Sequence, residues 1–173
     1  MADAKVVAAV RPGLLLYGLK PRPLSPDISV NPALQFRARV AHLKTVAPGT
    51  PVSYGGKFVA PRTSRIATLS AGYADGIPRT DAMRERGVLR HGDDVLKVAG
   101  TVCMDLTMVD ATDAPGLSVG DEVTVWGDAP TAWDVAGWAG TNAWQVLTGV
   151  GARVPRRYTL GGEIVGEDLL REG

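Results

Sequence analysis

The side chains that most often catalyse reactions or bind metals are scarce in this sequence. Its two histidines, His42 and His91, have no Ser, Cys or carboxylate partner at the spacing of a catalytic motif. The single cysteine, Cys103, lies in apolar surroundings, and one cysteine excludes an intramolecular disulfide and a paired-cysteine zinc site. No glycine-rich phosphate loop of the Walker or dinucleotide type occurs. We therefore predict no metal site and no Ser–His or Cys–His nucleophile.

Six short strings contain charged, aromatic or sulfur-containing side chains, and five of them also contain glycine or proline. Taken alone, each fits an ordinary structural role: Tyr54 as a strand aromatic, Met104 as a core side chain, Asp75 as a turn residue. In chain order the strings are Val10–Gly18, Val52–Gly55, Gly72–Arg79, Cys103–Asp105, Gly120–Val123 and Arg153–Arg156.

The elements that must position these strings are mostly short strands. The 173 residues include 21 Gly and 12 Pro, which favours many turns over long helices. Residues 34–40 alternate apolar and polar side chains, as a half-buried strand does, and the alternation slips after Val40, which predicts a bulge. His91–Asp94 is typical of a hairpin turn. The other expected strands are Leu14–Gly18, Val52–Val59, Arg65–Ala71, Gly87–Arg90, Val95–Ala99, Leu106–Asp110, Glu122–Trp126 and Tyr158–Ile164.

Helical signal is confined to residues 131–149. Thr131 and Asp134 have the spacing of an N-terminal cap, Gly140 would end that helix, and residues 142–147 can form a second one. The sequence thus predicts a mainly β fold: a closed or nearly closed β-barrel with one or two short helices around 131–149.

Charge and composition exclude several classes of protein. A net charge of +1 argues against a general nucleic-acid binder, and no apolar run approaches the length of a membrane span. The N-terminus lacks the pattern of a secretory signal, so we expect a cytoplasmic protein. Basic residues concentrate before residue 91 and acidic ones after it. Either the first half supplies cations to an anionic ligand, or strands from both halves interleave and their charges mix.

Together the six strings resemble the C-terminal β-barrel domain of the bacterial alanine racemases, which use pyridoxal 5′-phosphate (PLP). Their order and spacing match that family from about Arg11 to about Tyr158. The resemblance implies three regions: residues 1–10 as a remnant of the last strand of an N-terminal α/β barrel, 11–162 as the β-barrel domain, and 163–173 as an acidic tail. The α/β barrel itself, with the lysine that forms the Schiff base with PLP, is absent from this chain.

The resemblance also implies roles for individual residues. Tyr54 would be the catalytic base contributed across a dimer, and the backbone N–H of Met104 would receive the substrate carboxylate. Tyr73 and Arg79 would line the entry channel. The residues implied for the cofactor are Arg11 at the pyridine nitrogen, Gly13 and Leu14 at the phosphate, and Trp144.

Two positions depart from the family pattern. Trp144 stands where the family usually has a tyrosine that reaches the PLP phosphate, although the indole N–H can still donate a hydrogen bond. Thr101 stands where arginine is common, which removes a cation from the entry channel. Both changes bear on substrate preference and rate.

The implied function is that of a domain of a PLP-dependent alanine racemase, which interconverts L- and D-alanine for peptidoglycan synthesis. Its partners would be the N-terminal α/β barrel, a second copy in a homodimer and alanine, with no nucleic acid and no membrane. Alone, without the PLP lysine, the chain should be inactive. Two alternatives remain: a non-catalytic binding or dimerisation module derived from this domain, and a domain of a broad-specificity amino-acid racemase or related PLP decarboxylase.

Overall fold

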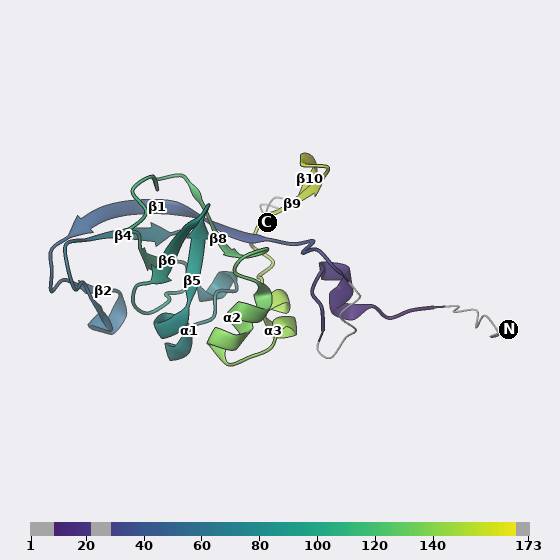
Figure 1. Cartoon of the computed structure of the whole chain (residues 1–173), viewed down its shortest axis with the longest axis horizontal. Coiled ribbons are helices and arrows are strands. Elements are labelled where there is room, and N and C mark those ends of the chain that lie inside the picture. The colour runs from purple at the N-terminus through teal and green to yellow at the C-terminus, as the bar shows by residue number, and fades with distance from the viewer. Residues whose placement is uncertain (1–8, 22–28, 169–173) are drawn as a thin grey trace.

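A closed antiparallel barrel of six strands forms the body of the molecule (Figure 1). The computed structural model describes residues 9–21 and 29–168. Around the barrel the strand order is β1-β4-β7-β6-β5-β8, which confirms the predicted fold class. The barrel strands are β1 (Phe36–Val46), β4 (Ser64–Leu69), β5 (Val88–His91), β6 (Asp94–Val98), β7 (Thr107–Asp110) and β8 (Glu122–Trp126).

Strand β1 closes the barrel because it is long enough to pair with two neighbours. Its first half is paired with β8 and its second half with β4. Phe36, Ala38 and Val40 are buried while the residues between them are exposed, as the alternation predicts. The register shifts between Val40 and His42, which confirms the bulge expected there. The predicted turn at His91–Asp94 is also confirmed, since it joins β5 to β6.

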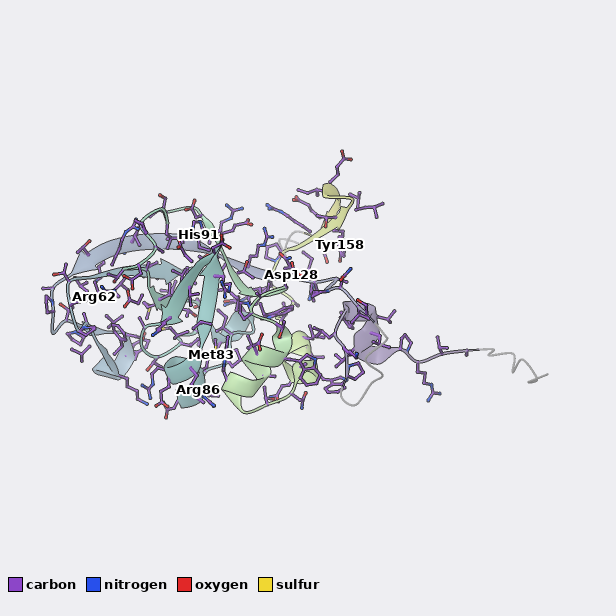
Figure 2. The ribbon with its side chains drawn as sticks, in the orientation of Figure 1. Arg62, Met83, Arg86, His91, Asp128 and Tyr158 are labelled. Carbon is purple, nitrogen blue, oxygen red and sulfur yellow. The ribbon has the colours of Figure 1, made fainter. Side chains whose placement is uncertain are left out.

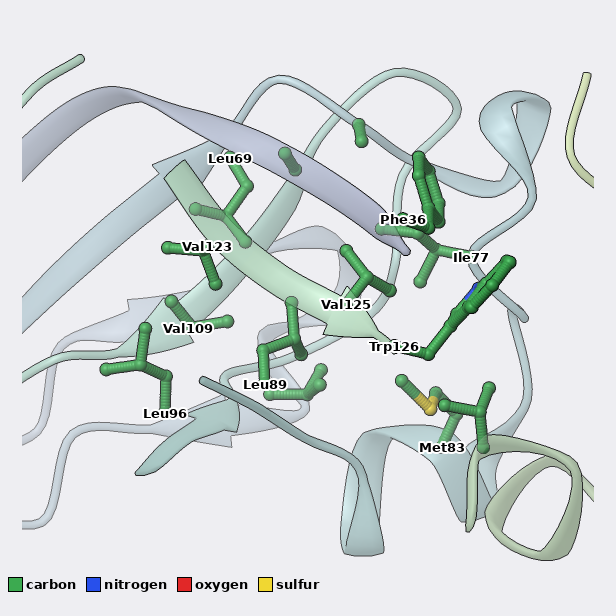
Figure 3. Packing of buried hydrophobic residues seen from close by; sticks show 14 of the residues in the cluster. Phe36, Leu69, Ile77, Met83, Leu89, Leu96, Val109, Val123, Val125 and Trp126 are labelled. Atoms are coloured by element: carbon green, nitrogen blue, oxygen red, sulfur yellow. The ribbon is translucent and has the colours of Figure 1, made fainter. Parts of the chain in front are cut away.

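The core fills the barrel and continues to one end, where the helices cover it. Leu69, Leu89 and Val123 pack inside the barrel, and Trp126 lies toward Met83 on α1 (Asp81–Arg86) (Figure 3). The ring of Phe36 contacts Trp126 with its centroid 6.0 Å away. This end of the core anchors the segments that carry the candidate site.

Two helices fall where the sequence predicts them: α2 (Ala132–Ala139) and α3 (Ala143–Thr148). The Thr131 hydroxyl accepts a hydrogen bond from the Asp134 N–H, the Asp134 carboxylate accepts one from the Thr131 N–H, and Gly140 ends α2 in the left-handed conformation. The expectation that helices stay within about 130–150 is wrong, because α1 lies outside that range. The six residues of α1 are too few to show helical periodicity in the sequence. Its N-terminus has one side-chain cap, in which the Thr80 hydroxyl accepts a hydrogen bond from the Met83 N–H.

Three expected strands are corrected by the backbone. Leu14–Gly18 lies in the 3₁₀ helix η1 (Gly13–Tyr17), which Gly18 ends in the left-handed conformation. Val52–Val59 is split into β2 (Pro51–Val52), η2 (Tyr54–Gly56) and β3 (Phe58–Val59), because Ser53 and the two glycines after Tyr54 have positive φ. Tyr158–Ile164 is a hairpin of β9 (Arg156–Leu160) and β10 (Glu163–Asp168), turned at Gly161–Gly162.

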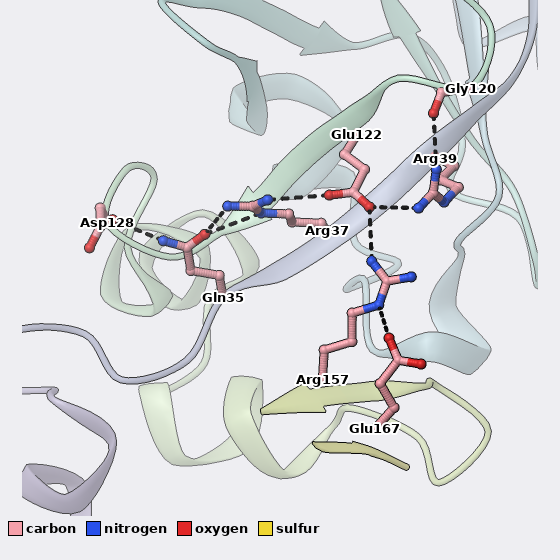
Figure 4. Close-up of polar contacts among 8 residues, drawn as sticks. All are labelled: Gln35, Arg37, Arg39, Gly120, Glu122, Asp128, Arg157 and Glu167. Carbon is pink, nitrogen blue, oxygen red and sulfur yellow. Dashed lines mark hydrogen bonds and ion pairs between the residues drawn. The ribbon is translucent and has the colours of Figure 1, made fainter. Parts of the chain in front are cut away.

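The β9–β10 hairpin projects from the barrel and carries Tyr158 (Figure 2). Charged side chains join it to the barrel: the Glu122 carboxylate lies 3.2 Å from Arg37, 2.9 Å from Arg39 and 3.8 Å from Arg157, and Arg157 also pairs with Glu167 (Figure 4). Arg37 and Arg39 come from the basic half of the sequence and Glu122 from the acidic half. On this face the charges of the two halves mix.

The regions expected from the resemblance overlap only partly with the described residues. Residues 1–8 of the expected barrel remnant and 169–173 of the expected acidic tail lie outside them. The first six residues of that tail form β10. Among the residues described, no helix has both the length and the apolar character needed to cross a membrane.

Candidate active site

The phenol of Tyr54 is held at the surface by a tightly bonded backbone. Tyr54 is 72% exposed. Next to it, Ser53 has a φ of 64° and its hydroxyl donates to the Thr101 carbonyl over 2.6 Å, while the Thr101 hydroxyl donates to the Tyr54 carbonyl over 3.1 Å. Gly100 lets these segments meet, since a Cβ there would lie 2.7 Å from the Val52 carbonyl oxygen. The backbone around Tyr54 is therefore fixed while its side chain reaches solvent.

Met104 lies in a second loop that packs directly on the loop of Tyr73. The Tyr73 N–H donates to the Cys103 carbonyl over 2.9 Å, and the Ala74 N–H donates to the Met104 carbonyl over 3.0 Å. Any Cβ at Gly72 would come within 2.4 Å of those carbonyl oxygens, so only glycine fits. Within the described residues the Met104 N–H has no acceptor, which leaves a donor free at the surface.

Tyr73 and Arg79 lie side by side next to the Met104 loop. The Arg79 guanidinium carbon is 5.3 Å from the centre of the Tyr73 ring, a cation–π geometry. Arg79 also lines a cavity of about 230 Å³ with Lys57, Arg84 and Thr101. Asp81 also lines the cavity and pairs with Lys57 and Arg84. Thr101 is the residue that bonds the Tyr54 backbone, so this cavity adjoins the Tyr54 segment. Tyr54, Tyr73, Arg79 and Met104 thus form one connected group.

The residues expected at the cofactor form a different group, on η1 and α3. Leu14 is buried in the main core, and the indole N–H of Trp133 on α2 donates to the Lys20 carbonyl over 3.1 Å. Trp133 also contacts Trp144 edge to face, with centroids 5.7 Å apart. Because of these contacts η1 is placed beside Trp144, which is half exposed.

Two backbone donors at the start of η1 have no acceptor among the described residues. Gly13 has a φ of +55° and nothing lies within 4 Å of where its Cβ would be. In the part of the chain that the structure describes, neither the Gly13 N–H nor the Leu14 N–H has an acceptor. The exposed Arg11 comes just before them. Free N–H groups, an open approach and a nearby cation suit an anionic group such as a phosphate ester.

A single chain does not bring the two groups together. The segment carrying Tyr54, beside β2, and η1, drawn in purple, lie toward opposite ends of the long axis of the molecule (Figure 1). Among the described residues, no hydrogen bond or ring contact joins Tyr54 to Arg11, Gly13 or Trp144. The chain therefore carries two separate groups of candidate residues, one around the Tyr54 phenol and the Met104 loop and one around η1 and Trp144.

One residue of the site was missed by sequence reasoning. Arg153 donates from Nε to Asp75 Oδ1 over 2.8 Å and from Nη2 to Asp105 Oδ1. Hydrogen bonds to Asp75 and then Asp105 raise the pKa of the Arg153 guanidinium above its ordinary value. Asp75 lies in its turn as expected, with Oδ2 accepting from the Gly72 N–H. The available signal was that Arg153, Asp75 and Asp105 each belong to one of the six strings.

Comparison with known protein families gives a direct match. The family model described as "Alanine racemase, C-terminal domain" matches residues 33–158. The chain belongs to the alanine racemase family. It corresponds to the C-terminal domain, and the family model covers the Tyr54, Tyr73, Met104 and Trp144 segments.

Individual alanine racemases align with almost the whole chain. The enzyme of Halothermothrix orenii is 44% identical over 154 residues, covering 86% of this chain and 40% of that racemase. The alanine racemase of Clostridium difficile 630, solved in complex with cycloserine, superposes with a TM-score of 0.80 at 33% identity over 89% of this chain and 41% of its own. The Bacillus anthracis structure with bound L-Ala-P gives a TM-score of 0.81 at 30% identity, over 91% of this chain and 41% of its own. The chain thus spans about 40% of the length of these racemases.

Proposed function

We propose that this chain supplies the β-barrel domain of an alanine racemase that interconverts L- and D-alanine. The observation that carries the proposal is the exposed phenol of Tyr54 on a fixed backbone, linked through Thr101 and Cys103 to the Met104 loop, whose N–H has no acceptor in the part of the chain that the structure describes. Racemisation needs proton transfer on both faces of the substrate Cα. Tyr54 would serve one face, and a lysine on the α/β barrel would serve the other.

Substrate orientation falls to the loop of Met104. Its N–H donates to the alanine carboxylate, which directs the Cα hydrogen toward Tyr54 Oη. In one direction the phenolate takes the proton from Cα, and in the other the phenol returns it. Tyr73 and Arg79 stand at the mouth of the site, where a cation attracts an amino acid carboxylate.

The η1 group fits PLP by the chemistry of its donors. The N–H groups of Gly13 and Leu14 would bind the phosphate, with the Trp144 indole N–H as a further donor. Arg11, which only donates, would bind an unprotonated pyridine nitrogen. When bound, PLP draws electrons from the substrate and so acidifies its Cα–H.

The separation of the two groups within one chain supports a homodimeric site. Tyr54 and Met104 of one copy would complete the cofactor half-site of the other, with each α/β barrel between them. Inactivity of the isolated chain, a cytoplasmic location and use of D-alanine in peptidoglycan synthesis belong to the same proposal.

The test replaces the matched C-terminal part of the Halothermothrix orenii racemase with residues 9–168 of this chain. In that fusion we expect racemase activity, and Tyr54→Phe should lower it on the order of 10²–10⁴-fold because a positioned acid–base group is lost. Tyr158→Phe, at an exposed tyrosine on the hairpin, is the matched control and should leave activity unchanged. Equal activity of the two variants in intact dimers would contradict the role of Tyr54. A folded, dimeric fusion that lacks activity would instead favour a non-catalytic module.

A further inference from the structure

We infer that Arg153 is a positioning residue for the substrate carboxylate site, because it fixes the Met104 loop against the Tyr73 loop. This inference rests on the proposed function, in which the Met104 N–H binds that carboxylate. The guanidinium of Arg153 bridges Asp75, two residues after Tyr73, and Asp105, the residue directly after Met104. One side chain thus joins three of the six sequence strings.

The backbone of the loop that carries Arg153 is fixed by contacts of its own, apart from those of the Arg153 side chain. Gly151 N–H donates to the Asp75 carbonyl over 3.4 Å, and Val154 N–H donates to the Gly151 carbonyl over 3.2 Å. A Cβ at Gly151 would lie 2.9 Å from the Ala74 carbonyl oxygen, and one at Gly76 would lie 2.8 Å from the Gly149 carbonyl oxygen. The loop after α3 therefore packs backbone to backbone on the Tyr73 loop.

The Tyr73 loop consequently contacts both of the other loops. The Arg153 loop contacts it through Gly151, and the Met104 loop contacts it through Ala74 and Gly72. The Arg153 side chain spans from the first loop past Asp75 to Asp105 on the third. The planar guanidinium can donate to two carboxylates at once from different nitrogens, whereas a lysine offers a single charged centre.

Exposure distinguishes the two contacts. The Asp75 side chain is 12% exposed, and both its oxygens are bonded, one by Gly72 N–H and one by Arg153. The Asp105 side chain is 57% exposed. Asp75 therefore anchors Arg153, and Asp105 is the contact through which Arg153 sets the position of Met104.

The first measurement is amide hydrogen exchange on the 173-residue chain. Arg153→Met should speed exchange of the Ala74 N–H, which donates to Met104, by about tenfold, because a charge-assisted contact is lost. The Ala99 N–H, bonded to Met108 in the barrel, should stay unchanged. Asp105→Asn should also speed exchange of the Ala74 N–H, and Arg153→Lys should speed it by a smaller factor than Arg153→Met. Arg62→Met, which breaks an exposed ion pair with Asp113, is the control and should leave Ala74 unchanged.

Equal exchange at Ala74 in wild type and Asp105→Asn would overturn the inference, and so would an equal rise at Ala99. If Arg153→Met does not fold, the exposed Asp105→Asn decides the result alone. None of these outcomes depends on racemase activity.

The second measurement is the kinetics of the racemase fusion. Binding of the carboxylate is common to ground state and transition state, so Asp105→Asn should raise KM for alanine by about tenfold, and kcat should fall as well because the misplaced carboxylate no longer directs the Cα hydrogen toward Tyr54. A KM equal to that of the unsubstituted fusion would overturn the positioning role, since a smaller folded fraction lowers kcat without changing KM. If the unsubstituted fusion is inactive, the proposed function fails, while hydrogen exchange still decides whether Arg153 fixes the Met104 loop.

Discussion

At the scale of single residues, the orientation of Tyr54 depends on an unfavourable backbone conformation next to it. Ser53 has a positive φ, which is uncommon outside glycine and persists only when surrounding contacts enforce it. Here two hydrogen bonds with Thr101 and the close approach of Gly100 enforce it. Tyr54 owes its fixed position to neighbours rather than to its own side chain.

Gly100→Ala should therefore disturb both stability and the Tyr54 segment. Gly100 has a φ of +98°, and a Cβ would lie 2.7 Å from the Val52 carbonyl oxygen and 2.8 Å from the Ser53 Cβ. We expect a loss of about 2 kcal/mol in the free energy of unfolding, measured by urea denaturation. Gly116→Ala is the control, because nothing lies within 4 Å of its Cβ and its φ is not positive. Equal effects of the two substitutions would contradict this account of the Tyr54 backbone.

The candidate site could be predicted from the sequence only as far as its motifs extend. Tyr54, Tyr73, Arg79 and Met104 lie in short strings, and the structure brings them together. Arg153 also lies in such a string, but its role follows from contacts with residues 78 and 48 positions away, which no local pattern specifies. A backbone N–H that lacks an acceptor among the described residues, such as that of Met104, is likewise a property of the folded backbone.

At the scale of elements, one ion pair connects the segment after Tyr54 to α1. Lys57 lies 3.0 Å from Asp81, the first residue of that helix. The hydrogen bond and charge of Lys57, with a smaller contribution from Arg84, lower the pKa of the Asp81 carboxyl. A depressed carboxyl pKa stabilises the fold above the pKa of the unfolded chain, and that stabilisation is lost as pH falls through the folded pKa.

Lys57→Met should accordingly let the pKa of Asp81 rise toward its ordinary value. An NMR titration of the Asp81 side chain measures this shift directly. The control is Lys44→Met, at an exposed lysine of β1, which should leave the Asp81 pKa unchanged. An Asp81 pKa that is the same in wild type and Lys57→Met would show that this ion pair does not form in solution.

Elements whose signal is local could be predicted, and those fixed by packing could not. The alternation and bulge of β1 and the capping box of α2 are properties of neighbouring residues, and both are confirmed. The apolar run Leu14–Leu16 equally suits a strand or a helical turn, and η1 is decided by its packing on the core and by Gly18. Helix α1 is too short for periodicity to show.

At the scale of the whole molecule, basic residues of the first half and an acidic residue of the second half form ion pairs where the β9–β10 hairpin meets the barrel. Glu122 faces three arginines, Arg37 and Arg39 on β1 and Arg157 on β9. Single exposed ion pairs contribute little, but here one carboxylate balances several cations. The opposite charges of the two halves thus pair with each other where the hairpin meets the barrel.

Glu122→Gln should lower the free energy of unfolding by about 1 kcal/mol at low salt, because three arginines lose their shared partner. The loss should shrink at high salt, where the remaining repulsion is screened. Urea denaturation at two NaCl concentrations measures both effects. Glu163→Gln is the control, because Glu163 forms no ion pair with any residue that the structure describes. A loss that does not depend on salt would contradict the electrostatic origin.

The measurement that most directly tests Tyr54 as a one-sided acid–base group is loss of α-deuterium from labelled D- and L-alanine in the racemase fusion. We assign the L-alanine face to Tyr54 and the D-alanine face to the lysine of the α/β barrel. In Tyr54→Phe, exchange from D-alanine should persist after net racemisation has fallen on the order of 10²–10⁴-fold, while exchange from L-alanine is lost. Equal loss of exchange from both enantiomers, or an unchanged racemisation rate in an intact dimer, would contradict that role.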